Sequence, residues 1–124
     1  MDSSTLIAPG NYVLNVRLAS PEVSIAFLEA SLVGFLNEAG RIHNALFNLP
    51  LIVTSGNDGQ HVPGSAHGKN EAADLRSHDL SDVEQLIFFL CMIRIQEKFG
   101  IVILDERYTH APHWHVQTAE SIGG

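Results

Sequence analysis

The stretch EAADLRSHDLSDVEQLIFFLCMIRIQEKFGIVILDERYTHAPHWHVQ, residues 71–117, determines the predicted fold. A capping box, Ser81 with Glu84 three residues later, marks the start of a helix. We expect this helix to run to about Phe99 and to stop at Gly100, because glycine readily adopts the left-handed conformation that ends helices. Around the helix, alternating or β-branched residues predict three strands, over residues 71–76, 101–106 and 113–117.

The N-terminal half predicts one further helix and two further strands. Alternation over residues 11–18 indicates a strand, and the short β-branched segment 51–54 indicates a buried one. Ser20-Pro21-Glu22 has the composition of a helix start, and apolar spacing extends that helix to about Phe47, although two glycines weaken it. The strands and helices do not alternate as in parallel sheets, so the pattern predicts an α+β domain with a small, largely antiparallel sheet and two main helices.

Length, charge and composition limit the class of protein. The 124 residues fit a single domain, 1–124, in which we expect residues 1–10 and 118–124 to be flexible. A net charge of -7 argues against a nucleic-acid partner, which would require a basic surface. The sequence shows no signal peptide and no apolar run long enough for a membrane span, so we expect a cytoplasmic or phage-encoded protein without a membrane partner.

The last predicted strand carries two histidines on one face. Side chains alternate along a strand, so His113, His115 and Gln117 share one face, while Trp114 and Val116 share the other, apolar face. Two imidazoles about 7 Å apart can address one small site. The alternative interpretation is a pair of surface histidines on an edge strand.

A carboxylate on a neighbouring strand extends this pattern. Ala72, Asp74 and Arg76 share one face of the segment 71–76, and the small alanine leaves room beside the aspartate. A buried carboxylate must be paired or bound to a metal ion, because an isolated buried charge is unfavourable. Asp74 therefore binds a metal ion, pairs with Arg76 or caps a turn.

Two motifs in these segments resemble those of a known family. The pattern SxHxxNxAxD over residues 65–74 and the sequence HWHV over residues 113–116 are similar to motifs of the D-Ala-D-Ala carboxypeptidase and hedgehog-type zinc metallopeptidases. The resemblance covers residues 51–117 and implies a hedgehog/DD-peptidase-like fold that binds one Zn²⁺ ion. It implies His67, Asp74 and His115 as the metal ligands. Two histidines and one carboxylate leave the fourth position of tetrahedral zinc open, as in catalytic sites.

The same resemblance implies an activity and a substrate. Members of the family hydrolyse peptide bonds of bacterial cell-wall peptides, next to D-alanine or between L-Ala and D-Glu. The expected partner is therefore a peptide or peptidoglycan fragment. The oligomeric state is not indicated by the sequence.

Three departures from the family pattern affect the expected chemistry. Asn70 replaces a glycine, no arginine follows the Thr-Ser-Gly segment that ends at Gly56, and Pro112 stands where many members carry a catalytic acid. A zinc hydrolase needs a group that accepts the water proton and passes it to the leaving amine. Glu106 is the favoured candidate and Asp105 is the alternative, because the two point to opposite faces of their strand.

Three further residues complete the predicted site. His113 is expected to hydrogen-bond an oxyanion or a carboxylate, and His61 and Ser65 are candidates for substrate contacts. The main alternative function is a non-catalytic zinc-binding domain of the same fold, in which the missing acid and arginine reflect lost catalysis. A metal-free domain with incidental histidines is a third possibility.

Overall fold

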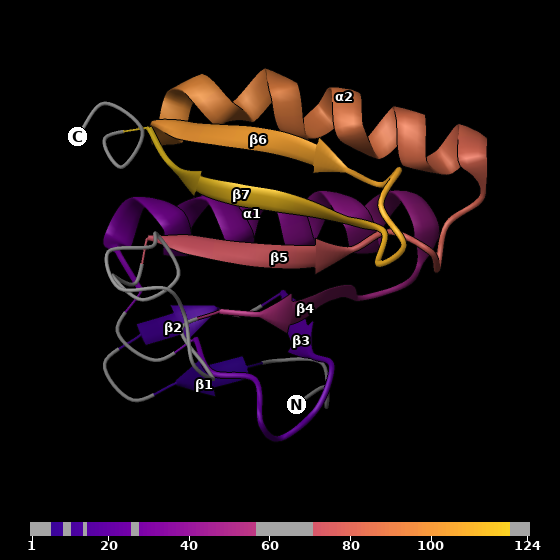
Figure 1. Cartoon of the computed structure of the whole chain (residues 1–124). Coiled ribbons are helices and arrows are strands. Elements are labelled where there is room, and N and C mark those ends of the chain that lie inside the picture. Colours follow the sequence, from indigo (N-terminus) through magenta and orange to yellow (C-terminus); the bar gives the residue numbers. More distant parts are fainter. Residues whose placement is uncertain (1–5, 9–10, 14, 26–27, 57–70, 120–124) are drawn as a thin grey trace.

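A computed structural model of the chain describes residues 6–8, 11–13, 15–25, 28–56 and 71–119. Within these residues, two helices lie against a five-stranded, mostly antiparallel sheet, which is the small α+β fold that the sequence predicted (Figure 1). None of the described helices is both long enough and apolar enough to cross a membrane.

The main sheet of the described chain consists of β3 (Val16–Leu18), β4 (Leu51–Ser55), β5 (Ala72–Arg76), β6 (Ile101–Glu106) and β7 (His113–Thr118). Their order across the sheet is β3-β4-β5-β7-β6. Strands β3 and β4 are parallel, and every other neighbouring pair in this sheet is antiparallel. A separate antiparallel pair, β1 (Leu6–Ala8) and β2 (Asn11–Val13), precedes the sheet in the chain.

Each helix connects two strands that run in the same direction. Helix α1 (Ala30–Phe47) joins the parallel strands β3 and β4, and α2 (Asp82–Phe99) joins β5 to β6. Strand β7 lies between β5 and β6 and is antiparallel to both, so β5 and β6 also share a direction. Both helices therefore form crossover connections. Strands still follow one another directly at β4–β5 and β6–β7, so the element order does not alternate strictly.

Aromatic rings from both helices and from the sheet meet in the core. The ring of Phe88 on α2 lies 5.5 Å from that of Trp114 on β7 and 4.9 Å from that of His43 on α1, between centroids. All three residues are at most 1% exposed, which confirms the prediction that Trp114 belongs to the core. Because α1, α2 and β7 meet here, both helices cover the same face of the sheet, and the opposite face is turned to the viewer in Figure 1.

The predicted strand over residues 11–18 is wrong, since the chain forms two short strands of different sheets there. Between them lies a turn at Asn15, whose side-chain amide donates hydrogen bonds to the backbone and side-chain oxygens of Asn37 at 3.2 and 2.9 Å. The carbonyl group of Asn15 also lies against Gly40 of α1, closer than any Cβ atom would allow. Contacts with α1 therefore position this bend, and local alternation does not reveal them.

The predicted helix start at Ser20-Pro21-Glu22 is also wrong, because α1 begins at Ala30. Residues 20–23 instead form a turn closed by a backbone hydrogen bond of 3.2 Å. Ile25 and Leu28 follow, and both are buried without being helical. The N-cap residue, Glu29, makes no side-chain capping bond, so the start of α1 carries no local signal that a sequence pattern could detect.

The second helix agrees with its prediction at both ends. The Ser81 hydroxyl accepts a hydrogen bond from the Glu84 N–H at 3.2 Å, and the Glu84 carboxylate accepts one from the Ser81 N–H at 2.9 Å. Gly100 ends the helix in the left-handed conformation, with a φ of 65°. Within the ends that the sequence predicted to be flexible, residues 6–8 form β1 and Thr118 ends β7 with only 5% exposure, while residues 1–5, 9–10 and 120–124 lie outside the described residues.

Candidate functional site

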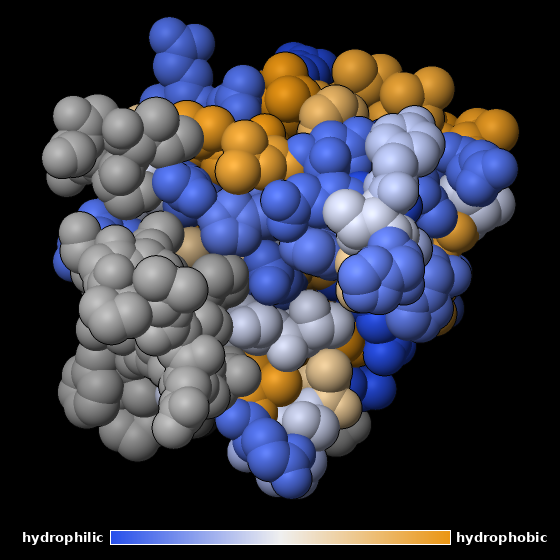
Figure 2. Space-filling model, in the orientation of Figure 1, coloured by the Kyte–Doolittle hydropathy of each residue, from blue (hydrophilic) through white to orange (hydrophobic). Residues whose placement is uncertain are grey.

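Polar and titratable side chains gather on the sheet face that the helices do not cover. Figure 2 shows hydrophilic residues over the centre of this face. The sheet register places Asp74 of β5 opposite His115 of β7, and Glu106 of β6 opposite His113 of β7. The predicted face of β7 is thus observed: His113, His115 and Gln117 are partly exposed, while Trp114 and Val116 are fully buried on the helix side.

Asp74 lies between the two histidines of β7. Its Oδ1 atom is 3.0 Å from Nδ1 of His115 and 3.6 Å from Nε2 of His113. In a tetrahedral zinc site, bonds of about 2.1 Å place neighbouring ligand atoms roughly 3.4 Å apart. The spacing of Asp74 with each imidazole therefore fits two ligands of one metal ion.

Glu106 extends the cluster through His113. The Glu106 Oε1 atom lies 2.7 Å from Nε2 of His113, and the other ring nitrogen of that histidine lies 2.7 Å from the carbonyl oxygen of Ala111. Both ring nitrogens of His113 thus face oxygen atoms. His113 bridges the two carboxylates, Glu106 on one edge strand and Asp74 on an inner strand.

Gln117 is a member of the cluster to which the sequence assigned no role. Its Oε1 atom lies 2.5 Å from Nε2 of His115, while Nδ1 of the same ring faces Asp74. A hydrogen bond to one ring nitrogen fixes the orientation of the imidazole and thereby of the other nitrogen. The signal that could have identified Gln117 is its position two residues after His115, on the same face of the strand.

Asp105, the alternative candidate for the base, lies on the other side of the sheet. It is opposite Trp114 in the register, and its carboxylate accepts two hydrogen bonds of 2.7 Å from the Arg107 guanidinium. These bonds lower the pKa of Asp105 below its ordinary value. The structure brings Glu106, and not Asp105, to Asp74 and His113.

Two alternative interpretations, histidines on an edge strand and an Asp74–Arg76 pair, do not match the geometry. Strand β7 lies between β5 and β6, so its histidines are not on an edge strand. The Arg76 guanidinium binds the Asp79 carboxylate at 2.9 and 3.1 Å and does not pair with Asp74. Asp74 is therefore not neutralised by its neighbour on the same strand.

Three predicted residues, His61, Ser65 and His67, lie outside the described residues, as does Asn70. Among the residues that the structure does describe, no group of three His, Cys, Asp or Glu side chains is arranged to hold a metal ion. Asp74 and His115 thus supply a candidate pair of ligands, and the third ligand implied by the family resemblance is His67. Pro112, where many family members carry an acid, directly precedes β7 and is exposed.

Comparison of the chain with protein-family models, with curated proteins and with solved structures found no match.

Proposed function

We propose that the chain is a zinc-dependent peptidase that hydrolyses peptide bonds of bacterial cell-wall peptides, of the D-Ala-D-Ala carboxypeptidase or L-Ala-D-Glu endopeptidase type, on a hedgehog/DD-peptidase-like fold. One observation carries the proposal: Asp74, His115 and the Glu106–His113 pair converge from three strands on one open sheet face. The motifs over residues 65–74 and 113–116 supply the substrate class by resemblance.

In this proposal Asp74 and His115 hold the zinc ion together with His67. Zinc, when bound, would lower the pKa of a coordinated water toward neutrality and polarise the scissile carbonyl. Gln117 keeps the His115 ring in place through its contact with Nε2. In zinc sites, a hydrogen bond of this kind orients the histidine that binds the metal.

The Glu106 carboxylate then acts as the general base and acid. It accepts the proton of the attacking water and delivers it to the leaving amine nitrogen, so that the proton is conserved over the reaction. His113 orients this carboxylate through the 2.7 Å contact between Nε2 and Oε1. This assignment explains how the site can act although Pro112 replaces the acid of the usual family position.

The proposal is tested by incubating the zinc-loaded protein with peptidoglycan fragments and analysing the products by mass. We expect cleavage by the unmodified protein and a loss of about 10²-fold or more in rate for Glu106→Gln, with bound zinc retained. Asp105→Asn is the matched control, because it changes the adjacent carboxylate on the opposite face of the same strand. His115→Ala is expected to lose zinc.

The possible results separate the candidate functions. One bound zinc ion without cleavage of any fragment would replace the peptidase with a non-catalytic zinc-binding domain. No bound zinc after loading would overturn both. Cleavage that is lost in Asp105→Asn but kept in Glu106→Gln would reverse the assignment of the base.

A further inference from the structure

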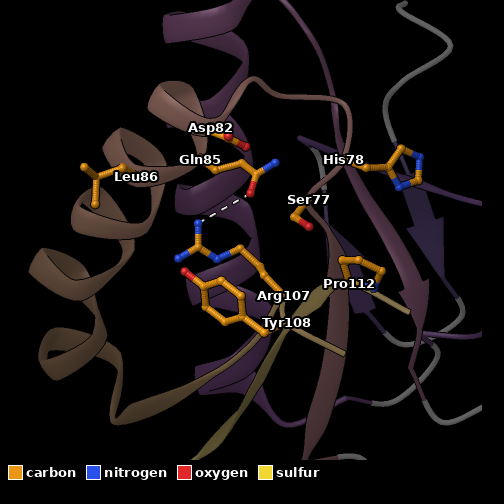
Figure 3. Close-up of a pocket in the computed structure, with 8 residues that line it drawn as sticks. All are labelled: Ser77, His78, Asp82, Gln85, Leu86, Arg107, Tyr108 and Pro112. Atoms are coloured by element: carbon orange, nitrogen blue, oxygen red, sulfur yellow. Dashed lines mark hydrogen bonds between the residues drawn. The ribbon is translucent and has the colours of Figure 1, made fainter. Parts of the chain in front are cut away.

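A cavity of about 540 Å³ lies apart from the cluster of Asp74, Glu106, His113 and His115, at the end of the sheet where β5 and β6 stop and α2 begins (Figure 3). Its volume falls in the range of about 300–1,000 Å³ that small-molecule sites occupy. Four short segments line it: the residues after β5, the first turns of α2, the residues after β6, and Pro112 before β7. None of Asp74, Glu106, His113 or His115 is among its lining residues.

A buried hydroxyl without a partner borders this cavity. Ser77 is only 1% exposed, and its Oγ atom has no hydrogen-bond partner in the described part of the chain. Buried polar groups without hydrogen bonds are rare in native proteins, because water would satisfy them in the unfolded chain. Figure 3 shows Ser77 between His78, Arg107 and Pro112, all of which line the cavity.

The guanidinium of Arg107 forms a rigid polar wall of the cavity. It donates two hydrogen bonds to Asp105 and one, of 3.4 Å, to the Gln85 side-chain oxygen. Three aromatic rings lie near it, with centroids 5.4 to 5.8 Å from Cζ. Since arginine has five N–H donors, two of them remain for an acceptor on a bound molecule.

The charges around the cavity favour a neutral ligand. The Asp105 carboxylate balances the charge of Arg107, and the Asp82 carboxylate on the first turn of α2 disfavours an anion. Tyr108, which is 89% exposed, offers an aromatic surface and a phenol at the rim. The wall therefore presents donors, acceptors and an apolar ring to the same small space.

We propose that this cavity binds a neutral sugar ring. Each hydroxyl of such a ring both donates and accepts a hydrogen bond, which matches the Ser77 hydroxyl, the remaining Arg107 donors and the Asp82 acceptors. The C–H face of the ring packs on Tyr108. The binding requires neither zinc nor the activity proposed above.

The proposal is tested by titrating the ¹⁵N-labelled, full-length protein with glucose and with N-acetylglucosamine and recording amide chemical shifts. We expect saturable shifts at Ser77, Gln85 and Tyr108, with a dissociation constant on the order of millimolar, as is typical of a ligand this small. Tyr108→Ala and Ser77→Ala should each weaken binding at least about tenfold. His110→Ala is the matched control, because this exposed residue of the same loop does not line the cavity.

The sugar binding of Ser77→Ala, measured together with its thermal stability, separates a ligand contact from a merely tolerated hydroxyl. Both interpretations predict an unchanged or raised Tm, because the variant removes an unsatisfied buried group. Only a ligand contact predicts weakened sugar binding as well. Absence of saturable shifts with either sugar, shifts confined to other parts of the molecule, or unchanged binding in both variants would overturn the proposal, as would tighter binding of the neutral peptide triglycine at these residues.

Discussion

Helices α1 and α2 have the same length, 18 residues each, but they depend on different interactions. α1 lacks a side-chain N-cap and buries six residues of its length against the sheet. α2 has a capping box, acidic residues in its first turn and a lysine in its last, yet it buries fully only Phe88 and Met92. Its outer face instead exposes a row of large apolar side chains: Val83, Leu86, Ile87, Leu90 and Ile93.

This comparison shows which interactions determine where each helix begins and ends. The limits of α2 are set by groups within or next to the helix, which a sequence pattern detects directly. The limits of α1 are set by the elements against which it packs, so that even a good helix-start composition ten residues upstream does not start it. Variants in the two helices should therefore differ in the size and the origin of their effects.

The largest difference in stability between variants of the two helices is expected when a buried aromatic ring of α1 is removed. Phe35 is fully buried and packs edge-on against Phe99, with centroids 6.4 Å apart. Phe35→Ala should lower the free energy of unfolding by about 3–5 kcal/mol, measured by urea denaturation. Leu90→Ala, on the outer face of α2, should change it by about 0.5 kcal/mol or less. Equal effects of the two variants would contradict the comparison.

A smaller loss is expected where α1 meets the bend before β3. Gly40→Ala would gain helix propensity, worth about 0.5–1 kcal/mol. The added Cβ would collide with the Asn15 carbonyl group, and such overpacking costs about 1–3 kcal/mol. We expect a net loss of stability in the same denaturation measurement. A net gain in stability would show that the backbone at Asn15 can move away from the added Cβ at little cost.

Disruption of the capping box of α2 should lower the free energy of unfolding by about 1 kcal/mol. Ser81→Ala removes the hydroxyl that accepts the Glu84 N–H and leaves one helix N–H without its partner. Thermal unfolding should show a lowered Tm with an unchanged fold by circular dichroism. Glu29→Ala, at the corresponding position of α1, is the matched control and should have no comparable effect, because Glu29 makes no capping bond.

The smallest effect is a pH dependence that belongs to α1 alone. Burial lowers the pKa of His43 below its ordinary value, since the charged imidazole loses its hydration, while one ring nitrogen bonds to the Leu49 carbonyl oxygen at 2.7 Å. The unfolded chain then binds more protons than the folded one below about pH 6.5. Stability is therefore complete above that pH and falls as the pH decreases toward the folded-state pKa.

The measurement is the free energy of unfolding between pH 5 and pH 8, a window around the ordinary histidine value of about 6.5. His43→Gln should remove part of the decline at low pH, although it lowers stability throughout. An identical slope in the variant would assign the decline to other groups.

The candidate site was predictable in its faces but not in its contacts. Strand alternation places His113 and His115 on one side and Trp114 on the other, and the structure agrees. Alternation also states that Glu106 and Asp105 point apart, but it does not say which of them faces the histidines. That choice depends on the register between β6 and β7, which pairs Glu106 with His113.

The partners of the charged residues likewise could not be predicted from the sequence. Arg76 is one possible partner of Asp74 by sequence, yet it binds Asp79 in the turn that follows β5. The contact between Gln117 and His115, by contrast, joins residues two apart on one strand. Short-range contacts of that kind follow from the strand geometry once the strand is known.

The sequence by itself determined the strands around α2, both ends of α2, and the division of β7 into a buried and an open face. These features depend on local hydrogen bonds, a left-handed glycine and side-chain alternation, all of which act within a few residues. Only the tertiary structure decided the start of α1, the bend at Asn15, the order of the strands, and which of Asp105 and Glu106 faces the histidines. These depend on packing and pairing between segments far apart in the chain, where burial outweighs local preference.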